Sequence, residues 1–470
     1  MLYQSNQAVC FKDGYYSFGA AVTARADAAL DNDILRGIFS LYLHSAASLT
    51  VTPGDKNTCI IGDEMLPEVG DADYAVRVTP KGIALAASDD KALRRAFLTL
   101  LDFVEPVCLE AGKEAYRVPC FTYSEKPQIG TRMVHLCIFP ETEYTFFRKF
   151  VRLCGVLQFT HIVLEFWGML QYDCLRELGW KHAWTKDMVK AAVADANALG
   201  MEVIPMFNHL GHAAGSRSCS GKHVVLDQNP RLATYFTEDG WVWAIEKPEV
   251  RALLRKVRGE LIDLCGSGSY FHIGCDEAYV YGDDREKAPV LVDYIGEIVE
   301  DLEKQGRKAI LWGDMFLKSH GTFKYPENRY YCNCRDEVIE KIFLDGLDRR
   351  AVIADWQYEA PTAPFETSLF FKEQGFATLV CPWETLNAKN TFAAAETVKN
   401  SGMDGYMLTT WHTHDRLQSL IKDALMLRDT KLGAVDYGIT AGALLRRIWF
   451  VDGNYADAGW KTKQVVQQFS

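Results

Sequence analysis

Two adjacent acidic residues, Asp276 and Glu277, end a short strand-like run that begins at Tyr270. Carboxylates at the carboxyl end of a strand in an α/β chain lie where active sites are usually built. A pair of them favours acid–base chemistry on a bond that must be protonated to break. Asp-Glu pairs are also common in exposed loops, so the surrounding residues must decide between a site and a solvated turn. Because neighbouring strand residues point to opposite faces, both carboxylates reach one pocket only if the chain turns near Cys275, which Gly274 permits.

Polar and aromatic residues recur at the ends of the other strand-like runs. Five of the eleven tryptophans lie at such ends, although any single one is as readily explained by core packing. Aromatic walls with carboxylates between them suit sugars, whose C–H faces stack on rings while their hydroxyls bind charged groups. The set comprises Arg132, His135, Glu165, Trp167, His209, His212, Trp312, Asp314, Asp355, Trp356, Tyr358, Trp383, Glu384, Trp411, His412, His414 and Asp415.

The histidines permit a metal site as a rival interpretation. His209 with His212, and His412 with His414, have spacings that metal ligands use, but neither pair has an evident third ligand. The Cys332-Asn-Cys334 segment likewise has no second pair at zinc-site spacing. We therefore expect no metal and no other cofactor.

Strand-like and helical patterns alternate from residue 130 onward. The strand-like runs are Arg132–Ile138, His161–Phe166, Glu202–Phe207, Tyr270–Gly274, Lys308–Trp312, Ala351–Trp356, Ala377–Cys381 and Tyr406–Trp411, and the helical patterns include Tyr144–Leu157, Thr185–Leu199, Pro248–Leu264 and Pro289–Gln305. This alternation predicts an α/β fold, a (β/α)8 TIM barrel over residues 123–430. A doubly wound sheet is disfavoured because no glycine-rich phosphate turn follows the first strand. A small α+β domain is expected over 1–122, and a helical segment packed on the barrel over 431–470.

Composition limits the possible partners. The chain has 470 residues, 48% of them hydrophobic, and its net charge of −11 is spread without long basic runs. Nucleic acid, which requires clustered Lys and Arg, and an anionic membrane surface are therefore disfavoured. The amino terminus shows no secretory or membrane-spanning pattern, and the thirteen cysteines have no paired spacing, so we expect reduced thiols in a cytoplasmic protein. Base rates for soluble enzymes suggest a homodimer.

Four segments resemble glycoside hydrolase family 20, the β-N-acetylhexosaminidases, and in particular its cytosolic hexosaminidase D branch. The specific one is His272-Ile-Gly-Cys-Asp-Glu277; the supporting ones are Arg132–Leu136, Glu202–His212 and Leu408–His412. The resemblance implies a retaining exo-enzyme that removes terminal β-linked GalNAc or GlcNAc from glycans or glycoconjugates. The nucleophile would be the substrate's own 2-acetamido oxygen, which forms an oxazolinium ion.

The resemblance also assigns roles. Glu277 would be the acid and then the base, and Asp276 would orient the acetamido group and stabilise its positive charge. Tyr358 would bond the acetamido oxygen and His212 would lie behind the acid. The substrate-binding residues would be Arg132, Glu165, Trp312, Asp314, Trp356, Trp383 and Trp411, with Glu165 also a candidate to orient His212.

Two segments depart from secreted members of the family, so sugar contacts from the first strand are not assigned. The first strand has Leu136-Cys137-Ile138 where many of them carry an aspartate, and the eighth ends differently, at His412–Asp415. A barrel glycosidase with two protein carboxylates and a non-catalytic sugar-binding protein on the same scaffold remain possible. The preference between GalNAc and GlcNAc, the natural glycan and the number of subsites are not assigned.

Overall fold

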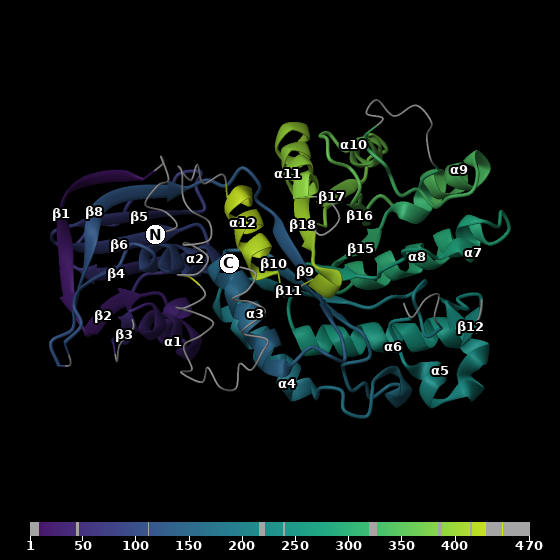
Figure 1. The fold of residues 1–470 in the computed structure, drawn as a ribbon, viewed down its shortest axis with the longest axis horizontal. Helices are drawn as coiled ribbons and strands as arrows, with labels where there is room; N and C mark the ends of the chain where they lie inside the picture. The colour runs from purple at the N-terminus through teal and green to yellow at the C-terminus, as the bar shows by residue number, and fades with distance from the viewer. Residues whose placement is uncertain are drawn as a thin grey trace.

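The computed structural model describes residues 9–43, 47–110, 112–215, 221–237, 240–318, 327–383, 388–413, 416–428 and 444. It shows a β-rich amino-terminal unit beside a closed barrel surrounded by helices (Figure 1). The (β/α)8 barrel and the preceding α+β domain predicted from the sequence are both confirmed.

The amino-terminal unit is built on an eight-stranded sheet of order β1-β8-β5-β6-β4-β2-β3, with β7 paired to β8. Its pairs are antiparallel except for β2 with β3. Its elements are β1 (Cys10–Gly19), β2 (Ala21–Ala26), α1 (Asp33–Tyr42), β3 (Ser48–Pro53), β4 (Thr58–Gly62), β5 (Tyr74–Thr79), β6 (Gly82–Ala87), α2 (Asp90–Leu101), β7 (Glu105–Cys108) and β8 (Ala115–Glu125). Since β8 runs to Glu125, this sheet extends past residue 122.

The barrel closes in the order β10-β11-β14-β15-β16-β17-β18-β9, and all of its strand pairs are parallel. Its strands are β9 (Arg132–Ile138), β10 (His161–Phe166), β11 (Glu202–Met206), β14 (Tyr270–His272), β15 (Lys308–Trp312), β16 (Val352–Trp356), β17 (Ala377–Cys381) and β18 (Gly405–Thr409). One longer helix follows each strand: α3 (Tyr144–Val156), α4 (Lys186–Ala198), α6 (Pro248–Cys265), α8 (Ala288–Glu303), α9 (Glu337–Gly346), α10 (Glu366–Glu373), α11 (Ala388–Ser401) and α12 (Leu417–Leu427). Short elements in the loops are α5 (Val225–Gln228), β12 (Phe236–Thr237), β13 (Val242–Trp243) and α7 (Tyr279–Gly282).

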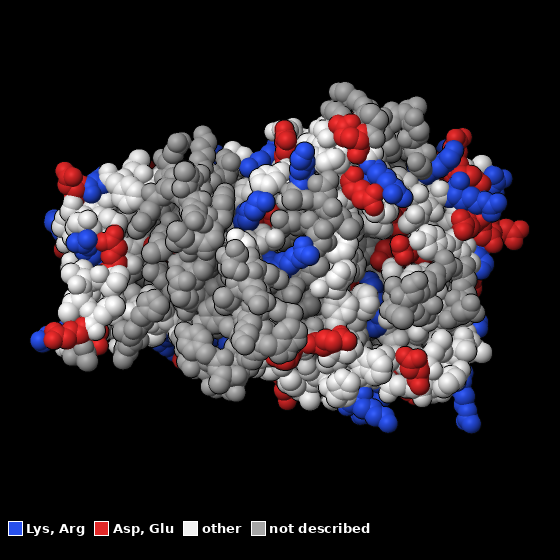
Figure 2. Space-filling view, viewed as in Figure 1, with Lys and Arg blue, Asp and Glu red and all other residues white. Residues whose placement is uncertain are grey.

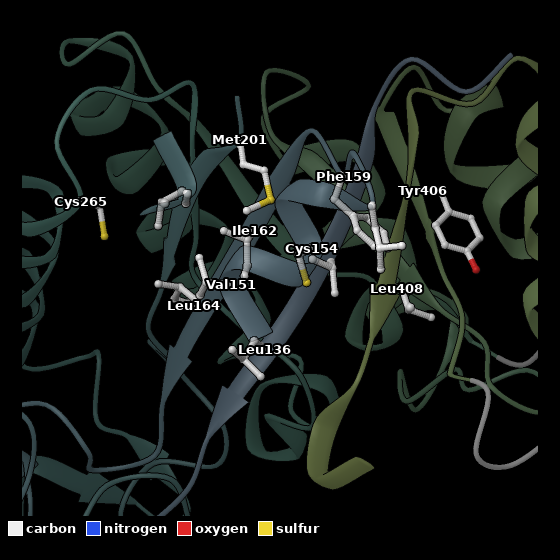
Figure 3. Packing of buried hydrophobic residues seen from close by; sticks show 14 of the residues in the cluster. Leu136, Val151, Cys154, Phe159, Ile162, Leu164, Met201, Cys265, Tyr406 and Leu408 are labelled. Carbon is white, nitrogen blue, oxygen red and sulfur yellow. The ribbon is translucent and has the colours of Figure 1, made fainter. Parts of the chain in front are cut away.

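The barrel has two apolar layers. Inside it, side chains such as Met133, Ile310 and Met407 fill the centre, so the barrel is packed rather than open. Outside it, Leu136, Ile162 and other strand residues meet α3 and its neighbours (Figure 3). Burial on both faces explains why these strands read as continuous apolar runs instead of alternating ones.

The amino end of the barrel is covered by α2, which lies between the sheet and the barrel (Figure 1). Gln158, in the turn before β10, donates to Thr99 Oγ1 of α2 over 2.8 Å. Arg428, after α12, donates to Glu125 Oε2 of β8 over 2.8 Å, and both side chains are about 3% exposed. This foot is therefore occupied by contacts within the chain, which leaves the opposite, carboxyl end of the strands for a site.

The described surface carries charges of both signs. Figure 2 shows Lys and Arg as well as Asp and Glu on the visible face. Among the described residues, no helix is long and apolar enough to cross a membrane. The described cysteines are all free thiols. Of the helical segment expected over 431–470, only Leu444 lies within the described residues.

Candidate active site

The Asp276–Glu277 pair lies on a distorted turn directly after β14. The strand ends at His272, and positive φ angles follow at Gly274 (74°), Cys275 (84°) and Glu277 (50°). Positive φ is uncommon for residues other than glycine and is concentrated at functional sites. The turn brings both carboxylates to one imidazole: His212 Nε2 lies 3.2 Å from Asp276 Oδ2 and 3.3 Å from Glu277 Oε2. The two neighbours therefore share one site because the strand ends before them.

Close backbone packing holds this turn in place. The loop after β11 passes so near that a Cβ on Gly211 would lie 2.1 Å from the Asp276 carbonyl oxygen. From the same loop, Asn208 Nδ2 donates to Asp276 Oδ1 over 3.0 Å. Trp241 Nε1 donates to the carbonyl oxygen of Glu277 over 2.9 Å. The loop after β11 and its neighbours thus orient the pair through both main chain and side chain.

The two carboxylates have unequal environments. Asp276 is 5% exposed, whereas the side chain of Glu277 is 31% exposed. Burial alone would raise the pKa of Asp276, but the positive charges of Lys222 and His212 outweigh it and leave the pKa below its ordinary value. Asp276 is thus a buried anion, and Glu277 is the member of the pair that a bound molecule can reach.

His212 is a cation at neutral pH. Burial acts to lower its pKa, but Asp276 and Glu277 raise it to about 9. The residue has a φ of 56°, and its ring packs against Trp241 with centroids 4.4 Å apart. Its place behind the acidic pair agrees with the role expected from the sequence.

Lys222 is a site residue that the sequence analysis missed. Its side chain is 1% exposed, and Nζ lies 2.7 Å from Glu165 Oε1 and 3.8 Å from Asp276 Oδ2. Nζ also faces the rings of Trp411 at 5.0 Å and Trp167 at 5.4 Å. Lysine is almost never fully buried unless paired, and a lone lysine after a glycine in a loop has no pattern that indicates burial.

Glu165 contacts His135, Cys137 and Lys222 in the barrel interior, whereas His212 was its expected partner. Its Oε2 lies 2.9 Å from both His135 Nε2 and Cys137 Sγ, and its Oε1 pairs with Lys222. Its polar partners among the described residues do not include His212, so it does not orient that residue directly, and at 1% exposure its side chain is occupied by protein groups. The expected substrate contact of Glu165 stays a prediction. His135, Cys137 and Glu165 lie close enough to share a metal ion, but the lysine ammonium already supplies the positive charge that Glu165 requires.

Four of the expected aromatic residues form a continuous wall. Trp411 Nε1 donates to the Tyr358 hydroxyl over 2.7 Å, and the Tyr358 ring lies 5.1 Å from that of Trp356 and 5.4 Å from that of Trp383. Tyr331, which the sequence did not single out, stacks on Trp356 with centroids 4.6 Å apart. A wall of this kind is suited to the face of a sugar ring.

Trp312 and Asp314 lie beneath this wall instead of in it. Trp312 is fully buried in the barrel interior, with its ring 4.5 Å from that of His272. Asp314 is 2% exposed; it accepts hydrogen bonds from Glu277 N over 3.1 Å and from Trp356 Nε1 over 3.0 Å. Burial and the Asp276 charge raise the pKa of Asp314 to about 7. Asp314 thus links the acid's backbone to the wall, and the expected sugar contacts of these two residues stay predictions.

Arg132 lies at the opposite end of the barrel. It begins β9 and is 2% exposed, and its guanidinium donates to the carbonyl oxygens of Ile129 (2.7 Å) and Gln158 (3.1 Å). An arginine at the amino end of a barrel strand cannot reach a site at the carboxyl ends, so its expected contact with sugar hydroxyls is wrong. Glu384, His414 and Asp415, also noted in the sequence, lie outside the described residues.

Comparison with known proteins agrees with this geometry. Residues 168–385 match the family model "Glycosyl hydrolase family 20, catalytic domain", a range that includes the acidic pair, His212 and Lys222. The chain is 21% identical to hexosaminidase D of Bos taurus over 281 residues, which are 55% of this chain and 77% of that protein.

Solved structures share the fold over nearly the whole chain. The β-N-acetylhexosaminidase from Bacteroides fragilis has a TM-score of 0.66 at 16% identity, with 97% of this chain and 98% of that chain covered. The exo-β-N-acetylglucosaminidase from Vibrio harveyi, in complex with N-acetylglucosamine, has a TM-score of 0.64 at 14% identity, with 96% and 77% covered.

Proposed function

We propose that the protein is a retaining exo-β-N-acetylhexosaminidase that removes terminal β-linked GalNAc or GlcNAc, as the match of residues 168–385 to the catalytic-domain model of glycoside hydrolase family 20 supports. The observation that carries the proposal is the turn after β14, which presents one buried anion and one accessible carboxyl group side by side. Substrate-assisted cleavage needs this division of labour, because one carboxyl must transfer a proton while the other stays charged.

Glu277 is the proposed acid. In the first step it gives its proton to the leaving glycosidic oxygen as the C1–O bond breaks, and the substrate's acetamido oxygen forms the new bond to C1. In the second step water attacks C1 and the Glu277 carboxylate takes its proton, so the anomeric configuration is retained. Its exposure supports this assignment, because a bound substrate can reach it. The neighbouring His212 imidazolium stabilises the carboxylate that is formed in the first step and consumed in the second.

Asp276 is the proposed partner of the acetamido group. The oxazolinium ion carries a positive charge shared with the acetamido nitrogen, and a buried carboxylate in a low-dielectric site stabilises such a charge more strongly than water does. The depressed pKa of Asp276 supports this role, since the residue is then charged before the substrate arrives. The wall formed by Tyr358, Trp356, Trp383 and Trp411 is the proposed surface for the sugar and its acetyl methyl.

The two alternative functions receive less support from the described residues. A retaining glycosidase with two protein carboxylates needs a second, accessible carboxylate about 5 Å from the acid. Glu165, Asp314 and Asp355 are each at most 2% exposed and engaged in hydrogen bonds or ion pairs. A sugar-binding protein has no need of an acid that is held on a strained turn. Location in the cytoplasm and a homodimer stay predictions.

The decisive test is hydrolysis of four β-nitrophenyl glycosides: those of GalNAc, GlcNAc, galactose and glucose. We expect turnover of the two N-acetyl sugars alone, since galactose and glucose lack the acetamido nucleophile, and the ratio of the two rates ranks the preference at the 4-hydroxyl. Comparable turnover of the plain sugars would assign the nucleophile to the protein and refute the mechanism. Binding without turnover of any glycoside would favour the sugar-binding alternative.

A further inference from the structure

The most unusual group near the site is the buried Lys222 ammonium. Transfer of a charged amine into a protein interior is unfavourable unless partners compensate for it, so a lysine at 1% exposure requires an explanation. Its position beside Glu165 is one explanation. Its position 3.8 Å from Asp276 is a second, and the two have different consequences for catalysis.

We propose that Lys222 is a positioning residue of the reaction, whose ammonium group holds the Asp276 carboxylate as an anion and aligns it with the aromatic wall. This inference rests on the proposed function, in which Asp276 meets the acetamido group of the substrate. It adds Lys222 as the residue that keeps the Asp276 carboxylate charged for that contact. At 1% exposure Lys222 cannot touch a substrate, so it must act through its neighbours.

The charge balance of the site supports this role. Lys222 and protonated His212 are two positive charges that face two negative ones, Glu165 and Asp276. Removal of Lys222 leaves one buried negative charge without compensation, and such a charge is relieved by uptake of a proton. Asp276 would then become neutral at a higher pH than in the intact protein, since Glu165 repels its charge and burial also disfavours it.

The other ionisable groups that face Asp276 do not replace Lys222 below neutral pH. His272 is buried, with its pKa lowered to about 3, and is therefore neutral. Asp314, with a pKa raised to about 7, is protonated there, and burial holds the pKa of Tyr358 well above its ordinary value, so that it is protonated too. Among the described residues, the other cation that pairs with Asp276 is His212, which is shared with Glu277.

Lys222 also links this anion to the wall. Its Nζ faces the Trp411 ring at 5.0 Å, and Trp411 in turn donates to the Tyr358 hydroxyl over 2.7 Å. The Lys222 ammonium therefore faces both Asp276, which is proposed to meet the acetamido nitrogen, and Trp411. Trp411 in turn holds the Tyr358 hydroxyl, which is proposed to meet the acetamido oxygen. A cation in this place can fix the position of the carboxylate relative to the phenol.

The test is the pH profile of kcat/KM on the N-acetyl nitrophenyl glycosides for wild type, Lys222→Met and Lys222→Arg. We expect the acidic limb of Lys222→Met to move upward by at least one pH unit, which is a loss of tenfold or more relative to wild type at a pH below both limbs, and a larger change in kcat than in KM. Lys222→Arg should restore the limb because it keeps the charge. An unmoved limb in Lys222→Met would overturn the proposal.

The double variant Glu165→Gln/Lys222→Met separates the two explanations for the buried lysine. If Lys222 serves only to neutralise Glu165, removal of both charges returns the limb to its wild-type position, and this result would also overturn the proposal. If it acts on Asp276, part of the displacement persists, because Lys222 lowers the pKa of Asp276 more than Glu165 raises it. Thermal melting of each variant verifies that the compared proteins are folded.

A measurement without substrate keeps this inference distinct from the proposed function. Lys222 opposes protonation of His212, so Lys222→Met should raise the pKa of His212 further in an NMR titration of its imidazole. If the wild-type protein hydrolyses no N-acetyl glycoside, the proposed function fails, while the titration still reports whether Lys222 is coupled to the Asp276–His212 pair. An unchanged titration would refute that coupling.

Discussion

The turn that carries the acidic pair depends on Gly274 having no side chain. Its φ is 74°, and a Cβ there would lie 2.8 Å from Asn208 Nδ2 and 3.1 Å from Asn208 Cα. Alanine at this position must therefore displace Asn208, which donates to Asp276 Oδ1 over 3.0 Å. We expect Gly274→Ala to impair both folding and catalysis, for reasons that can be separated.

The matched control is Gly306→Ala. Gly306 has a φ of 70° and would place its Cβ with no heavy atom within 4 Å, so both variants incur the same conformational cost, about 1–2 kcal/mol of stability. Gly274→Ala additionally weakens a hydrogen bond to a charged acceptor, worth about 1.5–3 kcal/mol. If that bond is needed in the transition state, kcat/KM falls about 10- to 150-fold.

The assay combines kcat/KM on an N-acetyl nitrophenyl glycoside with thermal melting. Gly306→Ala should lower the melting temperature and leave kcat/KM of the folded protein unchanged. Gly274→Ala should lower both. If Gly274→Ala keeps kcat/KM within twofold of Gly306→Ala, the Asn208 contact does not matter for the reaction, and the account of how Asp276 is oriented is refuted.

Three further outcomes are expected. Glu277→Gln should keep the fold, seen by circular dichroism, but lose about 10²- to 10⁴-fold in kcat because it removes the transferable proton; an unchanged rate would exclude Glu277 as the acid. The pKa of His212 is raised from its ordinary value to about 9, so its ion pairs stabilise the fold fully below about pH 6.5. This stabilisation is lost as the pH rises through about 9. Urea unfolding should therefore show the stability of the wild-type protein falling between these two pH values, whereas that of His212→Asn should not fall in this way. Arg132→Met should destabilise the protein by about 1–3 kcal/mol for each carbonyl left without a donor and leave KM unchanged; a raised KM with normal stability would return Arg132 to the sugar site.

The sequence was sufficient for the features that depend on periodicity. The apolar runs and helical spacings placed all eight barrel strands within a few residues, and the Gly274-Cys275-Asp276-Glu277 run identified the turn, because a glycine before paired carboxylates has a local conformational meaning. The aromatic residues Trp356, Tyr358, Trp383 and Trp411 also came together, since strand ends of a barrel share one edge.

Roles that depend on how deeply a side chain is buried in the barrel could not be predicted from periodicity. Trp312 and Trp356 both end strand-like runs, yet Trp312 is fully buried in the barrel while Trp356 lines the wall, because successive strands contribute to different layers. Lys222 became a site residue through the path of a long loop, which has no periodicity to read. Arg132 was misplaced because its role was carried over from the family by residue type, although the predicted strand Arg132–Ile138 already put it at the amino end.

The foot of the barrel carries a further consequence. Tyr74, Glu125 and Gln158 join the sheet, α2 and the start of β10 through buried hydrogen bonds, and Arg428 connects the end of α12 to the same group. A barrel separated from the preceding unit would leave these polar groups unpaired in an apolar surface. The amino-terminal unit therefore completes the foot of the barrel, so the barrel is not a transferable module by itself.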